Sequence, residues 1–326
     1  MENPEEFQSR VKIEQFKQKT QQIRDLAASY IVGKQKEFDL LTVGLLAGGH
    51  VLIEGVPGVA KTLSAKLLAK MINTGFSRIQ FTPDLMPADV LGTAVFNLKN
   101  NDFEFKAGPI FSNLILIDEI NRAPAKTQSA LFEVMEERQV TIDKQTHPMP
   151  PLYMVVATQN PLEHEGTYRL PEAQLDRFIF KINVGYPSSE EEVEILKKHH
   201  QNQNFTKLET VQPVVSENEI IDLRTHLDQV HVDENILSYI TKIVGETRQN
   251  AMIYVGASPR ASIDLLRGSK ALALLKGRDF VTPEDVQYLA APVIIHRVIL
   301  SPEAELEGLT PEEVVNQMIK KIEVPR

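Results

Sequence analysis

The sequence predicts a three-layer α/β domain built on a parallel sheet, followed by a mainly α-helical domain. The first half alternates short apolar runs with helical patterns, as expected for strands covered on both faces. The second half shows helical patterns and few strand signals, and 326 residues exceed what one core usually supports. The predicted strands are Val51–Glu54, Ser77–Phe81, Leu114–Ile117, Tyr153–Ala157 and Phe178–Val184.

The two domains are expected to divide near Gly185-Tyr186-Pro187, giving an α/β domain over 1–187 and a helical domain over 188–326. A capping box is expected to start the second domain, with Ser188 or Ser189 as the cap and Glu191 or Glu192 three residues later. Later helix starts combine a capping hydroxyl, a proline and an acid. These are Thr282-Pro283-Glu284, Ser301-Pro302-Glu303 and Thr310-Pro311-Glu312.

A candidate phosphate-binding loop follows the first strand and precedes a helix expected over Leu63–Met71. It reads Gly55-Val56-Pro57-Gly58-Val59-Ala60-Lys61-Thr62, with Ala60 where the usual loop has its second glycine. In such loops backbone N–H groups approach the phosphates, and a lysine reaches their outer oxygens. The hydroxyl of Thr62 can ligate Mg²⁺. On the loop alone, an ordinary strand–turn–helix with a chance lysine is the competing interpretation.

Two carboxylates, Asp118 and Glu119, end the apolar strand that starts at Leu114. Ligands bind at the carboxyl ends of strands in open α/β sheets, so these acids are expected beside the loop. Asp118 would hold Mg²⁺ through its water shell, and Glu119 would orient and activate the attacking water. Alone, a strand that merely ends in solvent could carry both acids by chance; together with the loop, they predict a nucleotide site.

Composition narrows the classes of function. A formal net charge of −9 argues against a broad electrostatic grip on nucleic acid. The absence of cysteine removes disulfides, Cys-bound zinc and thiol catalysis, and fits a cytoplasmic protein. The most apolar stretch, 40–53, is shorter than the roughly 20 residues that a spanning helix needs, so no membrane span is predicted.

The stretch from Gly92 to Phe111 predicts a β-hairpin. Its residues alternate in character around a polar tip, Lys99-Asn100-Asn101-Asp102. From the residues alone, a surface hairpin without a contact role is the alternative to one that touches a substrate.

The chain resembles the MoxR-type AAA+ ATPases over about residues 31 to 310, through several motifs in order. Ala60, in the position before the lysine of the loop, is usual in this family, and the loop is the first of the matching motifs. They are Glu54–Thr62, Ile117–Ala123, Ala157–Pro161, Glu165–Tyr168, Leu170–Phe178 and Gly256–Ala261. One departure is Arg169, where such proteins often have proline.

The resemblance implies roles for further residues. Asn160 matches sensor 1, which helps to orient the attacking water, and Arg177 matches the arginine finger supplied to a neighbouring subunit's nucleotide. Arg260 matches sensor 2, which couples the nucleotide state to the angle between domains; the cis or trans action of Arg260 stays open. Without the resemblance, Arg177 would be taken as a structural arginine at a helix end, and Arg260 as a solvated residue at a helix start. The expected nucleotide-binding residues are Val32, Gly33, Gly55, Val56, Pro57, Gly58, Val59, Ala60, Lys61, Thr62 and Leu63.

The resemblance also implies an activity. It is Mg²⁺-dependent ATP hydrolysis by a ring-forming homo-oligomer, expected to be a hexamer, that remodels or matures a protein client. The expected partner carries a von Willebrand A domain, and the 92–111 hairpin resembles the helix-2 insert that faces the ring pore and engages substrates. Two alternatives stay open: a nucleic-acid-stimulated AAA+ motor and a non-catalytic nucleotide-binding scaffold.

Overall fold

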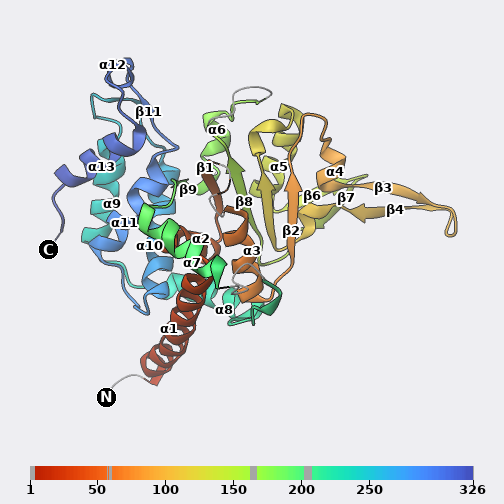
Figure 1. Cartoon of the computed structure of the whole chain (residues 1–326), viewed down its shortest axis with the longest axis horizontal. Coiled ribbons are helices and arrows are strands. Elements are labelled where there is room, and N and C mark those ends of the chain that lie inside the picture. The colour runs from red at the N-terminus through yellow and green to blue at the C-terminus, as the bar shows by residue number, and fades with distance from the viewer. Residues whose placement is uncertain (1–3, 57, 59–60, 162–166, 202–207, 326) are drawn as a thin grey trace.

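The computed structural model describes residues 4–56, 58, 61–161, 167–201 and 208–325, with the side chains of 4–16 and 209 left aside. A parallel sheet with helices on both faces lies beside a mainly helical region (Figure 1). All five predicted strands are present, with ends within two residues of the predicted ones. They are β1 (His50–Gly55), β2 (Phe76–Gln80), β5 (Leu114–Asp118), β8 (Met154–Gln159) and β9 (Phe178–Val184).

The strand order in the sheet is β2-β5-β8-β1-β9, and every pairing is parallel. The carboxyl ends of all five strands therefore lie at one edge. β8 runs between β1 and β5, although it follows both in the sequence. This order places the loop after β1, the residues after β8 and the acids after β5 next to one another.

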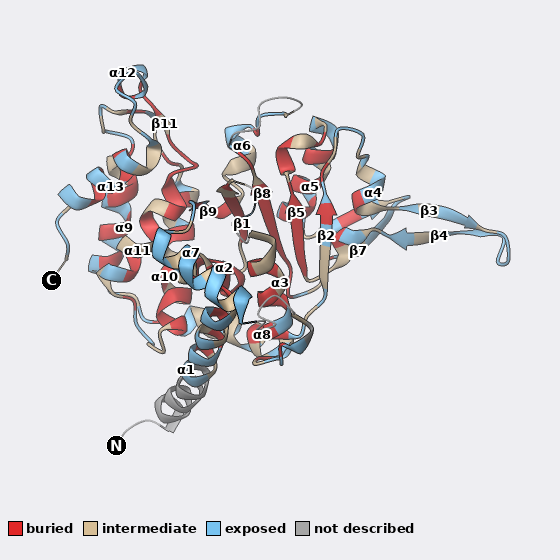
Figure 2. Cartoon of the chain, in the orientation of Figure 1, coloured by how far each residue is buried: buried red, intermediate tan, exposed pale blue. Residues whose placement is uncertain are grey.

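Two apolar cores explain why the strands read as nearly continuous apolar runs. Val51 and Ile53 face the core that includes α2 (Gln35–Leu46) and α3 (Lys61–Ile72). Leu52, which points to the other face, belongs to the core that contains residues of α5. α5 spans Ala125–Glu137. Figure 2 shows the strands buried between these layers. The three-layer α/β prediction is confirmed.

The region after β9 is mainly helical, as predicted. Ser188 caps α7 and forms the capping box with Glu191. Thr282, Ser301 and Thr310 each cap a helix that has proline in its first turn. The helices are α7 (Ser189–His200), α8 (Glu217–His226), α9 (Glu234–Glu246), α10 (Pro259–Leu275), α11 (Pro283–Ile294), α12 (Pro302–Leu306) and α13 (Pro311–Lys321), with a small strand pair β10 (Ile253–Val255) and β11 (Ile299–Leu300). The boundary at residue 187 stays a prediction.

The first core continues into this helical region. It includes residues of α9, α10, α11 and α13 together with Phe180 and Ile182 of β9. The long N-terminal helix α1 (Pro4–Tyr30) contacts both α2 and α10. None of the helices in the described ranges is long and apolar enough to cross a membrane.

The predicted hairpin is formed by β3 (Gly92–Asn97) and β4 (Asp102–Ala107), and it projects well beyond the sheet (Figure 1). Residues 109–111 form a short 3₁₀ turn rather than the end of the second strand. A second hairpin was not predicted: β6 (Gln139–Ile142) pairs with β7 (Gln145–Pro148). The two short helices α4 and α6 span Pro87–Leu91 and Glu172–Leu175.

Candidate functional site

Three neighbouring strands bring the predicted site residues to one edge of the sheet. Gly55 ends β1, Asp118 ends β5, and Asn160 directly follows β8. The register pairs residues 53 and 54 of β1 with residues 158 and 159 of β8, and residue 117 of β5 with residue 157. The candidate loop, the acids and the buried Asn160 therefore surround the end of β8.

The loop between β1 and α3 depends on glycine at its first position. A Cβ on Gly55 would lie 2.5 Å from the carbonyl oxygen of Val184, which ends β9. Gly58 has φ +85°, a backbone conformation that favours glycine. The predicted binding residues Pro57, Val59 and Ala60 lie outside the described residues.

Lys61 begins α3 and reaches back over the strand ends. Its Nζ donates to the carbonyl oxygen of Gly55 at 2.6 Å and lies 3.5 Å from that of Gln159. The ammonium group therefore lies between the ends of β1 and β8. Thr62 is half-buried in the first turn of the same helix. Val56 and Leu63 are partly buried against the core, so their side chains serve packing.

Val32 and Gly33 lie near the same strand ends. Lys34 Nζ donates to the carbonyl oxygen of Gly185 at 3.1 Å, and Gly185 follows Val184, the partner of Gly55. Val32 is buried and Gly33 has φ +70°. A Cβ on Gly33 would overlap the carboxyl group of Glu191, so this turn fits closely against α7.

Asp118 is held by two neighbours that were not predicted. Arg78 Nε donates to Asp118 Oδ2 at 2.6 Å, and Thr158 Oγ1 donates to Oδ1 at 3.1 Å. Asp118 is 7 % exposed, so these partners offset the cost of burying its charge. Arg78 lies on β2, the strand beside β5, so the strand order alone connects it with Asp118.

Glu119 has left-handed backbone, with φ +58°. Arg122 Nη1 and Gln80 Nε2 donate to its Oε2 at 2.8 and 2.9 Å, and its own N–H donates to Thr158 Oγ1 at 3.1 Å. The two acids therefore share Thr158 and have different cations as partners. Sequence reasoning missed Thr158 and Gln80; the signal for both was a polar side chain at a strand end, next to a predicted site residue.

Arg177 and Arg260 meet on Glu136 near the end of α5. Arg260 Nη2 lies 2.7 Å from both carboxylate oxygens, and Arg177 Nε lies 3.8 Å from Oε2. Burial lowers the pKa of Arg260, but the hydrogen bond to Glu136 and its charge outweigh this and raise it. Within the described ranges, neither guanidinium has a hydrogen bond or ion pair with the loop or with the two site carboxylates.

The position of Arg177 in the sheet explains this separation. Arg177 precedes β9, whose first residue pairs with His50 at the start of β1, so it lies at the amino-end edge. The loop lies at the carboxyl-end edge. The six residues of β1 place the two edges about 15–20 Å apart. The sheet therefore holds Arg177 away from the loop of its own chain.

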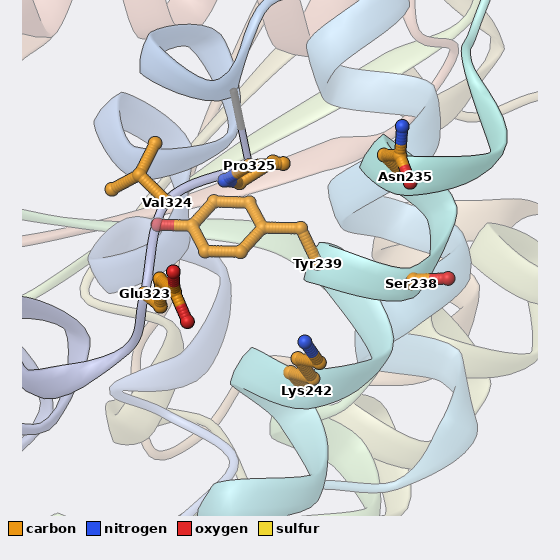
Figure 3. Close-up of a pocket in the computed structure, with 7 residues that line it drawn as sticks. All are labelled: Asn235, Ser238, Tyr239, Lys242, Glu323, Val324 and Pro325. Carbon is orange, nitrogen blue, oxygen red and sulfur yellow. The ribbon is translucent and has the colours of Figure 1, made fainter.

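A surface cavity of about 360 Å³ lies apart from this site, between α9 and the C-terminal tail (Figure 3). Its lining residues are Asn235, Ser238, Tyr239, Lys242, Glu323, Val324 and Pro325. None of these was predicted as a site residue. The cavity brings one lysine and one glutamate together and offers no concentration of charge.

Known proteins resemble the chain over both of its regions. The profile of the ATPase family associated with various cellular activities (AAA) matches residues 50–180, and that of the AAA lid domain matches residues 245–318. The chain is 44% identical over 305 residues to Chaperone MoxR1 of Mycobacterium tuberculosis, covering 91% of this chain and 80% of that protein. It is 28% identical over 318 residues to Protein MoxR of Paracoccus denitrificans, covering 90% and 93%.

A solved structure agrees with these matches. The crystal structure of a candidate ATPase from Cytophaga hutchinsonii has a TM-score of 0.90 and 41% identity to this chain, covering 99% of this chain and 100% of that one. The sheet order, the helical region after it and the near full-length match to Chaperone MoxR1 lead to the same family. The chain belongs to the MoxR-type AAA+ ATPases.

Proposed function

We propose that this chain is a Mg²⁺-dependent ATPase that remodels or matures a protein partner. A second copy of the chain completes its active site. The copies assemble into a ring, which we expect to be a hexamer. One observation carries the proposal: Lys61, the acids at 118 and 119, and Asn160 meet at the ends of three adjacent strands. The ammonium group of Lys61 lies between the ends of β1 and β8, and β5, which ends in Asp118, is the next strand along from β8.

The residues at this edge fit a magnesium nucleotide. The hydroxyl of Thr62 and the carboxylate of Asp118 are hard oxygen ligands of the kind that Mg²⁺ prefers. Because both oxygens of Asp118 already accept hydrogen bonds, the carboxylate is suited to holding the metal through its water shell. Mg²⁺, when bound, supplies positive charge that offsets the charge developing on the phosphates. Lys61 would bind the outer phosphate oxygens, with the loop from Gly55 around the nucleotide.

The remaining groups act on the attacking water. Glu119 would orient the water and accept its proton, while Asn160 at the end of β8 would fix the water's position. Gln80 and Arg122 hold the Glu119 carboxylate at this edge. The turn at Val32 and Gly33, close to the end of β9, would contact the adenine.

The distance of Arg177 from its own loop supports a site shared between subunits. A guanidinium at the opposite edge of the sheet can stabilise the transferred phosphoryl group only of a neighbouring copy. Head-to-tail contacts of this kind close into a ring when the rotation between neighbouring copies closes. Arg260 shares Glu136 with Arg177, so we propose that it also acts on the neighbour's nucleotide.

The β3–β4 hairpin supports a protein client. Its exposed apolar side chains include Phe96, Leu98 and Phe103, with Leu98 86% exposed at the tip. Apolar side chains on a projecting hairpin are suited to contact with another protein. A relative of this chain is named a chaperone. A partner that carries a von Willebrand A domain is part of the same proposal and rests on the family alone.

A Glu119→Gln substitution tests the hydrolytic role. The amide keeps the size of the side chain but cannot accept the proton, so turnover should fall by about 10²–10⁴ while ATP binding is retained. Phosphate release and calorimetric ATP binding measure the two effects. The matched control is Glu137→Gln, the same substitution at an exposed glutamate at the end of α5. This variant should keep wild-type turnover.

Wild-type turnover in the Glu119→Gln variant would contradict the proposal. ATP binding without phosphate release by the assembled wild-type protein would indicate a scaffold instead. Salt-sensitive stimulation of turnover by DNA would indicate a nucleic-acid motor.

A further inference from the structure

A second cavity, of about 550 Å³, lies at the edge of the sheet opposite to the candidate nucleotide loop. It opens beside Gly48, two residues before β1, whereas the loop follows β1. Its charged lining residues are Arg138 after α5, Arg224 on α8, Arg267 and Lys270 on α10, and Asp228. Four cations and one carboxylate therefore surround a single hollow.

Three guanidinium groups converge on Gly48. Atoms of Arg267, Arg138 and Arg224 lie 3.4, 3.7 and 3.9 Å from the position of a Cβ on this glycine. Each donates to a carbonyl oxygen at the end of α2. The bonds are Arg138 Nη2 to Gly48 O at 2.6 Å, Arg267 Nη2 to Ala47 O at 2.6 Å and Arg224 Nη2 to Leu45 O at 2.6 Å.

Carboxylate partners are missing from this cluster. In the described part of the chain, none of the four cations has an acidic oxygen within 4.0 Å. Other arginines that are shielded from solvent do have such partners. These pairs include Arg24 with Asp39, Arg278 with Asp285, and Arg297 with Asp176 and Asp264. A chain with net charge −9 thus leaves one group of cations without acids.

The positive charges of this cluster repel one another. Burial, followed by the charges of Arg138 and Arg267, lowers the pKa of Arg224 to about 10. Burial and the charge of Arg267 also lower the pKa of Arg138. Each shift means that the protonated guanidinium is less stable here than in water. An anion in the cavity would relieve this cost.

Capping of α2 accounts for only part of the arrangement. Cations are favourable near the carbonyl oxygens that end a helix, which explains the bonds from the arginines. It does not explain Lys270, whose side chain has no hydrogen bond or ion pair to any described residue. Nor does it explain Arg267, which is exposed at the cavity and uses one of its five N–H donors on Ala47.

We propose that this cavity binds a compact anion that carries several phosphate groups. Guanidinium forks bind phosphate oxygens in pairs, and a lysine adds a mobile positive charge. The volume lies within the range of small-molecule sites. The cations surround a hollow rather than forming a stripe, and the overall charge is negative, so the arrangement favours a small anion over a nucleic-acid backbone.

The lining of the cavity includes none of Glu136, Arg177 and Arg260, although Arg138 lies two residues after Glu136. Arg260 and Arg267 are seven residues apart on α10, which corresponds to about 10 Å along the helix. The proposal therefore does not depend on the ATPase function. The phosphates could belong to a free metabolite or to a nucleotide held by a neighbouring copy, and the experiment below separates these sources.

The test is calorimetric titration of the full-length Lys61→Ala variant with tripolyphosphate, at a protein concentration where it is monomeric. Lys61→Ala weakens phosphate binding at the loop, so the heat reports the second cavity. We expect tripolyphosphate to bind this variant. Adding either Lys270→Gln or Arg267→Gln should weaken the affinity about five- to tenfold, since each substitution removes a charged hydrogen-bond donor. Lys320→Gln, an exposed change on α13, is the control and should leave the affinity unchanged.

Three results would overturn the proposal. The first is the absence of binding in the monomeric Lys61→Ala variant, which would leave only a neighbour's nucleotide as a source. The second is an affinity that the changes at 267 and 270 do not alter. The third is a short single-stranded DNA that displaces tripolyphosphate and binds more tightly. Lys270 has no side-chain partner to lose, so its variant is expected to fold normally.

Discussion

Thr158 connects the two acids of the site through one buried hydroxyl. Its Oγ1 donates to Asp118 Oδ1 and accepts the backbone N–H of Glu119. Thr158 is 2% exposed, so water does not replace these bonds readily. The left-handed backbone of Glu119 depends on partners of this kind, because a residue other than glycine is strained there.

Thr158→Val should therefore destabilise the fold and slow turnover. Valine has the same shape but leaves the Glu119 N–H and one Asp118 oxygen without this partner, which costs about 1–3 kcal/mol of unfolding free energy. Urea denaturation measures the stability, and phosphate release measures turnover. The control is Thr241→Val on the solvent side of α9, whose hydroxyl bonds only its own helix. Equal stability of the two variants would contradict this role.

The close approach of β9 to the candidate loop requires a glycine. Gly55 pairs with Val184 at the end of the two strands, and the carbonyl of Val184 occupies the space of a Cβ. The helical region contains a contrasting glycine. Gly245 lies inside α9, and nothing lies within 4 Å of a Cβ placed on it.

The two glycines should respond to alanine in opposite directions. Gly55→Ala forces β9 or the loop to move and should cost about 1–3 kcal/mol. Gly245→Ala adds helix propensity without a clash and should stabilise the protein by about 0.5–1 kcal/mol. Thermal unfolding of both variants measures the effects. Destabilisation by Gly245→Ala, or none by Gly55→Ala, would show that the packing differs from that described.

The sequence predicted the elements with strong local signals. Buried strands such as Leu114–Asp118 are continuous apolar runs, and Ser188 with Glu191 forms a local capping pattern. The β6–β7 hairpin escaped prediction because its turn, Asp143-Lys144, takes positive φ at both residues without a glycine. The meeting of Arg177 and Arg260 on Glu136 could not be foreseen, because only the fold connects these distant positions.

Two buried histidines connect separate layers of the protein. His50 Nε2 donates to the carbonyl of Met135 on α5, and its Nδ1 accepts the N–H of Val155 on β8. His296, after α11, bonds through Nε2 to the carbonyl of Phe178 on β9. In both histidines one ring nitrogen must carry a hydrogen, and in His50 the other nitrogen must have a free lone pair. The neutral form of each imidazole meets these requirements.

Stability should therefore fall in acid. Burial lowers the pKa of His50 to about 4 from its ordinary 6.5, and burial also lowers that of His296. Below pH 6.5 His50 binds a proton in the unfolded chain but not in the folded protein. The free energy of unfolding therefore falls by up to about 3 kcal/mol between pH 6.5 and 4 because of this residue. Urea denaturation across this range should show a weaker dependence on pH in His50→Gln than in His199→Gln, the exposed control. Equal dependence in both would contradict the assignment.

In the proposed ring, one site takes residues from two copies, because the sheet holds Arg177 far from its own loop. The direct measurement is ATP turnover of mixed rings, made by co-expressing Glu119→Gln and Arg177→Ala chains. Each variant alone should be nearly inactive. In a random equal mixture about a quarter of the interfaces combine an intact Glu119 with a neighbour's intact Arg177, so about a quarter of wild-type turnover should return. Turnover no greater than the sum of the two separate variants would contradict the shared site.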